Sequence, residues 1–195
     1  METYYIVKYS GPFGFIKPWT AVRDSETFSQ QFLTPSIVEG IEKKLFPELL
    51  NEKGIKKIVA NRLSYSQINQ QQEVIQTRGW NSTRRGTQFL FDRPKAILIR
   101  GVLLNPILFL AFKNLEDAEI AFKQHICLCK NEDILLPTEL TEADKEEFDR
   151  AEEYSGYELV FGKSENSFHV GFDRKTNEPM YGWLKIVGTP VRSNR

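Results

Sequence analysis

A polar stretch at residues 64–88 contains the side chains best suited to binding a ligand. Arg78 and Trp80 flank a glycine, and Arg84 and Arg85 follow four residues later. Guanidinium groups pair with phosphate, and an indole ring offers a flat face on which a base can stack, a contact worth ~1–3 kcal/mol per base. The pattern therefore favours binding of single-stranded nucleic acid. The alternative is a solvated loop without a ligand, since charged surface loops are common.

A second segment, at residues 15–31, contains Lys17, Trp19 and Arg23. A loop that merely connects two elements seldom has this density of cations and aromatic rings, so we expect it to contact the same ligand. The alternative is that Trp19 and Phe28 fold inward over the core, because large aromatic side chains are highly buried on average.

A helix is predicted over residues 33–47, and its first turn is a possible anion site. Thr34 is a suitable N-cap, and Pro35 fits the first turn because its missing N–H would have no partner there. The free amides of that turn, with Ser36 and the positive end of the helix dipole, could bind a phosphate, and Lys43 adds a charge on the same helix. A capped amphipathic helix without a ligand is the commoner alternative.

Side chains suited to catalysis or metal binding are sparse. Lys123 and His125 could exchange protons, but residues two apart on a helix point in different directions. Cys127 and Cys129 have no second pair, which leaves too few ligands for structural zinc, and their spacing is poor for a disulfide. We therefore predict free thiols, no metal and no cofactor.

Strands on either side of the predicted helix must position these residues. Apolar side chains recur at every fourth position of the helix, and strands are predicted at 4–9 and 55–63. The stretch at 64–88 has few residues able to line a core. We therefore expect it to project from the body as a long hairpin or loop.

The rest of the chain alternates between strands and helices. The apolar runs at 95–104 and 107–112 are predicted as inner strands. Helical spacing predicts helices at 115–130 and at 141–155, the second facing water because it is nearly all charge. Further strands are predicted at 89–91, 157–161, 168–172 and 181–187.

The composition indicates one compact unit with an uneven distribution of charge. The 195 residues include 26 basic and 26 acidic ones, which excludes the signature of a highly basic nucleic-acid binder. Basic residues nevertheless predominate at 53–100 and acidic ones at 132–158, so we expect one positive face and one negative face or helix. No export signal and no apolar run of ~20 residues is present, which predicts a soluble cytoplasmic protein without a membrane partner.

The order of these segments resembles the Cas-five family, the RAMP-fold subunit that caps the five-prime handle of the guide RNA in CRISPR surveillance complexes. Family members have a strand that runs into a Gly-aromatic segment, similar to Ser10-Gly-Pro-Phe-Gly-Phe15 here. A Thr-Pro-Ser helix with an internal glycine follows, similar to Thr34-Pro-Ser36 and Gly40, and it ends in an aromatic residue and a proline, similar to Phe46-Pro47. The likeness covers residues 3 to about 104.

The resemblance is nearest to the type I-C branch, in which an Arg-rich projection leads into a long strand, as the segment from Arg85 to Arg100 does here. It implies an α+β fold: a ferredoxin-like, RRM- or RAMP-type domain at 1–112 with a β-hairpin thumb inserted at about 64–88. A short mixed extension at 113–195 would pack on the same core. The implied partners are the guide RNA (crRNA) and the backbone and large subunits of the complex, with target DNA only indirectly.

Type I-C members also cut the precursor guide RNA, but the resemblance does not extend to their catalytic residues. The family's tyrosine at the helix end falls on Phe46, which lacks a hydroxyl, and its Lys-His pair falls on Asp117-Ala118 or on Lys145-Glu146. Loss of these acid–base groups implies a binding protein that is not an enzyme. The alternatives are a metal-independent endoribonuclease with a rearranged site at His125, and a protein interaction module.

Overall fold

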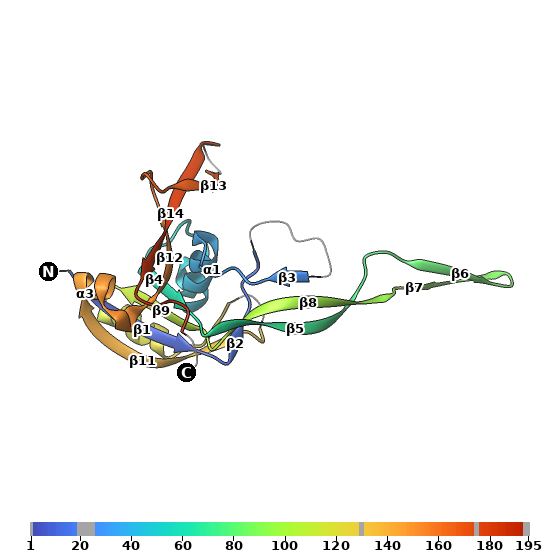
Figure 1. Ribbon diagram of the computed structural model, residues 1–195, viewed down its shortest axis with the longest axis horizontal. Coiled ribbons are helices and arrows are strands. Elements are labelled where there is room, and N and C mark those ends of the chain that lie inside the picture. The colour runs from blue at the N-terminus through green and yellow to red at the C-terminus, as the bar shows by residue number, and fades with distance from the viewer. Residues whose placement is uncertain (1, 19–25, 129–130, 174–175, 193–195) are drawn as a thin grey trace.

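A large antiparallel sheet organises the protein, whose computed structural model describes residues 2–18, 26–128, 131–173 and 176–192. The architecture is α+β, in which antiparallel strands predominate over short helices (Figure 1). Neighbouring strands follow the order β10-β11-β1-β9-β4-β12-β14-β13. Their bounds are β1 Thr3–Ser10, β4 Ile58–Ser64, β9 Ile107–Phe112, β10 Ile126–Cys127, β11 Ile134–Asp144, β12 Gly156–Phe161, β13 Phe168–Phe172 and β14 Pro179–Val187.

Two helices cover one face of this sheet. Helices α1 (Pro35–Leu45) and α2 (Leu115–Phe122) follow the chain order β1-α1-β4-β9-α2-β11, and the strands of this series are neighbours in the spatial order β11-β1-β9-β4. Val7 and Tyr9 of β1 face the helices, because alternate side chains of a strand lie on one side. The main core therefore lies between sheet and helices. Its members include Val38, Ile41, Leu45, Leu110, Phe112, Ala118 and Ala121.

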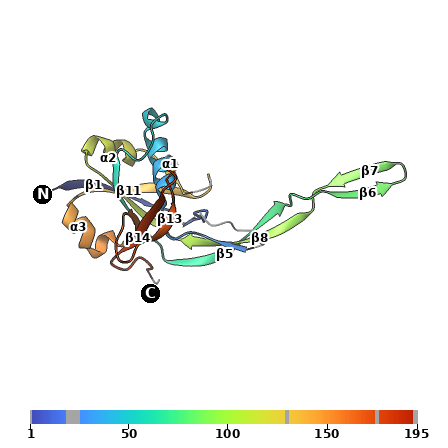
Figure 2. The ribbon, with the colours of Figure 1, turned by 90° about the horizontal axis from the view of Figure 1, so that it is seen from above.

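The opposite face of the inner strands is covered as well. Tyr4 of β1 points to this side and packs against Phe148 of α3 (Lys145–Arg150), at 6.0 Å between ring centroids. Tyr154 of the 3₁₀ helix η2 (Glu152–Tyr154) lies 5.1 Å from the same Phe148 ring. Figure 2 shows α3 on the side of the central strands away from α1 and α2. Helices α3 and η2 therefore cover part of this face.

A long hairpin projects from the body between β4 and β9 (Figures 1 and 2). Strands β5 (Gln67–Gln76) and β8 (Lys95–Leu104) pair along their whole length and form its proximal part. Strands β6 (Asn81–Arg85) and β7 (Gln88–Asp92) form a separate two-stranded ribbon at its distal end. The ladder is interrupted at Pro94, which has no N–H to donate. Two short strands, β2 (Phe13–Gly14) and β3 (Glu26–Phe28), pair with the base of β8.

A buried carboxylate fixes the segment that leads from α1 into β4. Glu42 is fully buried on α1, and its oxygens accept hydrogen bonds from three consecutive amides, those of Lys56, Lys57 and Ile58, at 2.6–3.1 Å. The side chain therefore provides the acceptor for amides at the start of β4, of which that of Ile58 is buried and would otherwise lack a partner.

Both helices predicted in the second half of the chain are shorter than expected. The helix predicted at 115–130 ends at Phe122, and Ile126–Cys127 form β10, which pairs with β11. The helix predicted at 141–155 is wrong in its first turn, because Thr141 pairs with Ile6 as part of β11. The helical spacing was a local signal, whereas the sheet supplies tertiary hydrogen bonds that override it.

The apolar run at 95–104 is a strand, but the prediction that it is an inner strand is wrong for most of its length. It is β8 of the hairpin, and Ile97 remains 55% exposed, whereas Gly101, Val102 and Leu103 are buried. The hairpin consequently spans 67–104 rather than about 64–88. By contrast, the strand predicted at 107–112 is β9, at the centre of the sheet.

The remaining predicted elements agree with the structure within a few residues. Helix α1 begins one residue after Thr34 as predicted, and β12, β13 and β14 match the strands predicted after residue 156. Beyond residue 112, β11 joins the same sheet as β1 and β9, and α2 packs on that sheet. Within the described ranges, none of the helices has the length and apolar character needed to cross a membrane.

Candidate functional site

The distal ribbon of the hairpin places cations against aromatic rings. The guanidinium of Arg93 lies over the Trp80 ring, 4.4 Å from its centroid, and Trp80 is 59% exposed. Arg84 lies 5.8 Å from the centroid of Phe89, and its Nε donates a hydrogen bond to the Gly86 carbonyl oxygen at 3.0 Å. Stacking leaves the guanidinium edge free to bind an anion, so these pairs combine a positive charge with a flat surface.

The turn at the tip determines which side chains share a face. Only two residues separate β6 from β7, and Gly86, the first of them, has a φ of +63°, which suits a type II′ hairpin turn. The resulting register pairs Arg84 with Phe89 and Arg85 with Gln88. Because side chains alternate along a strand, Arg84 and Arg85 point to opposite faces of the ribbon. Arg84 therefore shares a face with Phe89 and Phe91.

The arginines of the distal hairpin have no acidic partner. In the part of the chain that the structure describes, no ion pair forms at Arg78, Arg84, Arg85 or Arg93, and all four are exposed. Arg62 in the core differs, since it contacts both Asp149 and Glu158. Arg100 at the base of the hairpin is paired with Glu73. The distal cations are thus available to an external anion.

The start of α1 is a poorer anion site than the sequence suggested. Thr34 makes no side-chain cap, and its carbonyl accepts the amides of Ile37 and Val38 at 2.9 and 3.0 Å. Since Pro35 has no N–H, this leaves the Ser36 amide as the first-turn donor without a partner among the described residues. One amide binds phosphate weakly compared with the several that usually converge at such sites.

The predicted contact residues fall into separate regions of the molecule. Ser36 is exposed at the start of α1, and Lys43 is half-buried and paired with Glu39 at 2.7 Å. Helix α1 lies on the body, away from the distal ribbon (Figure 1). Lys17 is exposed between β2 and β3. Trp19 and Arg23 lie outside the described residues. The structure therefore brings together Arg78, Trp80, Arg84 and Arg85, but not Ser36 and Lys43, on the hairpin.

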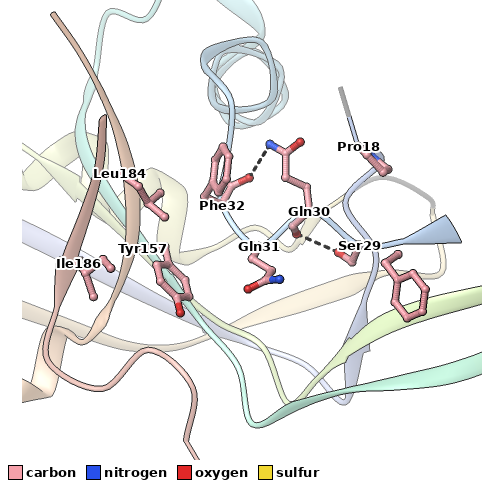
Figure 3. Close-up of a pocket in the computed structure, with 9 residues that line it drawn as sticks. Pro18, Ser29, Gln30, Gln31, Phe32, Tyr157, Leu184 and Ile186 are labelled. Carbon is pink, nitrogen blue, oxygen red and sulfur yellow. Dashed lines mark hydrogen bonds between the residues drawn. The ribbon is translucent and has the colours of Figure 1, made fainter. Parts of the chain in front are cut away.

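A groove at the base of the hairpin was not foreseen from the sequence. It has a volume of about 540 Å³ and lies between residues 28–32, which lead into α1, and one face of β12 and β14 (Figure 3). Tyr157, Leu184 and Ile186 form its floor, and Gln31 lines the opposite wall. No local signal could have revealed it, because its two sides are more than a hundred residues apart and meet only through pairing of β12 with β4.

The hydroxyl of Tyr65 fixes one wall of this groove. It donates a hydrogen bond to Oε1 of Gln31 at 2.6 Å, and the Tyr65 ring lies 6.5 Å from that of Tyr157. Burial raises the pKa of Tyr65 to about 12, so the hydroxyl retains its proton and remains a donor at neutral pH.

The positions matched to the family's catalytic residues have structural contacts instead. Phe46 is buried, lies edge-on to Phe112 at 6.0 Å, and has the ammonium of Lys57 4.1 Å from its ring centroid. Asp117 forms an ion pair with the same Lys57 at 2.8 Å. His125 is exposed, and its carbonyl oxygen accepts a hydrogen bond from Lys44. None of these contacts assembles an acid–base pair.

Metal ligands do not gather in the described ranges. No group of three or more His, Cys, Asp or Glu side chains there could hold a metal ion. Cys127 is a half-buried free thiol, and Cys129 lies outside the described residues.

Comparison of the sequence with protein-family models gave no match, and comparison with curated proteins gave none either. Function is therefore inferred from the residues and from the geometry of the hairpin.

Proposed function

We propose that this protein binds single-stranded RNA with its distal hairpin and serves as the guide-RNA subunit of a CRISPR surveillance complex. Its body would be a ferredoxin-like domain of RAMP type. The chain order β1-α1-β4-β9-α2-β11 and the spatial order β11-β1-β9-β4 support this assignment, since the four strands and two helices follow a split βαβ pattern. The hairpin inserted between β4 and β9 would be the thumb.

The observation that carries the proposal is the face shared by Arg84, Phe89 and Phe91. Phe89 is 60% and Phe91 65% exposed on a ribbon that has no covering layer among the described elements. A soluble protein rarely exposes adjacent aromatic rings without a use for them. Rings that alternate with unpaired guanidinium groups suit a single strand, because bases stack on the rings while phosphates pair with the cations.

The proposed subunit binds RNA without cutting it. The residues at the family's catalytic positions are engaged in packing and ion pairs, as Phe46 and Asp117 illustrate. In the proposed complex the backbone and large subunits would contact the body, and target DNA would be reached only through the guide RNA.

A salt titration of RNA binding tests the proposal. A labelled single-stranded repeat RNA should bind the purified protein, and Arg84→Ala should weaken binding and reduce the salt slope by about 0.7 per lost phosphate contact. Arg150→Ala on α3 removes the same charge from an exposed position away from the hairpin and should leave the slope unchanged. Equal slopes for the two variants would contradict the assignment of the RNA site to the ribbon.

Two further measurements test the role in a complex. The protein expressed with its neighbouring gene products should copurify with nuclease-resistant RNA and protein subunits. The purified chain should leave a labelled repeat RNA intact on incubation. Cleavage that His125→Ala abolishes would instead identify the protein as an endoribonuclease.

A further inference from the structure

The wall of the groove at the hairpin base is held rigidly by the backbone. The Ser29 amide donates to the Gly101 carbonyl at 2.7 Å, and the Gln30 amide donates to the Ile16 carbonyl at 2.9 Å. The Ser29 hydroxyl accepts a hydrogen bond from the Ile16 amide at 2.9 Å. Residues 28–32 are therefore fixed between two parts of the chain before any ligand arrives. A site organised in advance avoids the entropic cost of ordering its residues on binding.

The amide of Gln31 is oriented so that it presents donors. Its Oε1 accepts the Tyr65 hydroxyl at 2.6 Å, which fixes the direction of the Nε2 group. That NH₂ group has no partner among the residues that the structure describes, and Gln31 is exposed along the groove. A fixed amide with an occupied oxygen and two unused N–H groups recognises an acceptor such as a carbonyl oxygen.

The floor of the groove is flat and apolar. Tyr157 and Ile186 are paired across β12 and β14, and Leu184 lies two residues from Ile186 on the same face. Ile186 is 60% exposed, which is unusual for a large apolar side chain in a sheet. Phe28 and Phe32 add aromatic edges along the opposite side. Figure 3 shows Tyr157 and Ile186 on one side of the hollow and Gln31 on the other.

We infer that this groove binds one unstacked nucleobase of the RNA strand, with a preference for a base that has a carbonyl oxygen. The inference rests on the proposed function, because it requires an RNA strand that reaches the base of the hairpin. A volume of about 540 Å³ is in the range of small-ligand sites, and a base supplies the flat apolar face that Tyr157 and Ile186 would cover. Uracil, guanine and cytosine each offer a carbonyl oxygen to the Gln31 amide, whereas adenine offers only ring nitrogens as acceptors.

Continuity with the hairpin favours a nucleobase over a peptide. Phe28, which lines the groove, lies directly on Gly101 of β8, so the groove begins where the hairpin leaves the body. A strand that is bound at the distal ribbon and follows β8 towards the body arrives at this point.

Photo-crosslinking tests the inference. The labelled repeat RNA is substituted with 4-thiouridine at one uridine at a time, irradiated with the full-length protein, and the crosslinked peptides are identified by mass spectrometry. We expect one position to crosslink to the segment at 28–32 or to Tyr157. Gln31→Glu keeps the acceptor for Tyr65 but removes the donors, and should lower that crosslink yield about tenfold, equivalent to ~1.4 kcal/mol. Asn51→Asp introduces the same charge at an exposed position on the body, outside the groove and the hairpin, and should leave the yield unchanged.

The outcomes separate this inference from the proposed function. RNA that binds in an Arg84-dependent manner but crosslinks only to residues 78–93 would overturn the groove assignment and leave the guide-RNA role standing. A crosslink yield that Gln31→Glu leaves unchanged would also overturn the groove assignment. The same holds for a protein partner that covers the groove while RNA is bound elsewhere. Absence of any RNA binding would overturn both.

Discussion

The ring of Phe28 lies directly against the backbone of Gly101. A Cβ atom built on Gly101 would collide with the Cδ1, Cε1 and Cγ atoms of that ring. The two residues are partners in the parallel pairing of β3 with β8, which attaches the hairpin to the segment that leads into α1. Gly101 is therefore required because a side chain would not fit at this position, and not because its φ is unusual. The absence of a side chain allows Phe28 of the groove wall to pack directly on the base of the hairpin.

Replacement of Gly101 by alanine should separate the two segments. Gly101→Ala forces Phe28 out of its position, and we expect the free energy of unfolding to fall by about 1–3 kcal/mol, the usual cost of overpacking. Urea denaturation measures the change. Gly79→Ala is the matched control, because nothing lies within 4 Å of a Cβ at that position, and it should alter stability by less than about 0.5 kcal/mol. Equal effects of the two substitutions would show that the Phe28 contact is unimportant.

Loss of the Glu42 carboxylate should destabilise the junction of α1 and β4. Glu42→Ala leaves the buried amide of Ile58 and the more exposed amides of Lys56 and Lys57 without their acceptor, and we expect a loss of about 1–3 kcal/mol in unfolding free energy. Glu42→Gln retains one carbonyl oxygen and should cost less.

The control for this prediction is Glu119→Ala, which removes an exposed carboxylate from α2. Its effect should be within about 0.5 kcal/mol, since surface substitutions away from special features are nearly neutral. The prediction is wrong if Glu42→Ala unfolds at the same urea concentration as this control.

Local sequence signals were sufficient where the structure is local. The Thr34-Pro35 start and the apolar spacing of the following residues located α1 to within one residue at its beginning. The same reasoning failed at 141–155, because Thr141 to Asp144 pair with β1, more than a hundred residues earlier in the chain. Helical periodicity over a charged segment carries no information about such a distant partner.

The residue types of the candidate site were likewise predictable from the sequence, whereas their arrangement in space was not. The exposure of the cations and of Trp80 on a projecting segment could be predicted, since that stretch has few residues able to line a core. Their division between two faces depends on the register that the turn at Gly86 sets. A shift of that register by one residue would move every side chain to the other face. The groove depends on the position of β12 and β14 beside residues 28–32, which only the complete sheet creates.

Replacement of the buried Arg62 alone should lower the unfolding free energy much more than replacement of Arg62 together with neutralisation of its acidic partners. It is fully buried between Asp149, at 2.8 Å, and Glu158, and its Nε has no acceptor in the described part of the chain. Arg62→Met leaves the Glu158 carboxylate without its cation and leaves Asp149 with Lys185 alone, at 2.5 Å, and we expect a loss of about 3–5 kcal/mol.

Neutralising the partners tests this explanation. Arg62→Met combined with Asp149→Asn and Glu158→Gln removes the uncompensated charge, so most of the lost stability should return. Urea denaturation of the single and triple variants gives the comparison. A triple variant no more stable than the single one would mean that Arg62 acts through packing on Phe148, whose ring centroid lies 4.7 Å from the guanidinium.

Stability should decline at alkaline pH through the buried tyrosines. Burial raises the pKa of Tyr65 from 10.0 to about 12 and raises that of Tyr9 as well, so the unfolded chain releases these protons at lower pH than the folded one. Their contribution is fully present below about pH 10 and is lost as pH rises through the folded pKa. Urea denaturation between about pH 8 and 12 should therefore show unfolding free energy falling above about pH 10.

Tyr65→Phe separates the proton-linked part of this decline from the hydrogen bond to Gln31. At about pH 8 the variant should be less stable by roughly 1 kcal/mol, because Oε1 of Gln31 loses its donor. Above about pH 10 its unfolding free energy should fall less steeply than that of the unaltered protein, because one fewer group with a raised pKa is present. Parallel curves over the whole range would mean that Tyr65 does not lose its proton on unfolding in this interval, and the decline would then have to come from the other tyrosines whose pKa burial raises, Tyr4, Tyr9 and Tyr154.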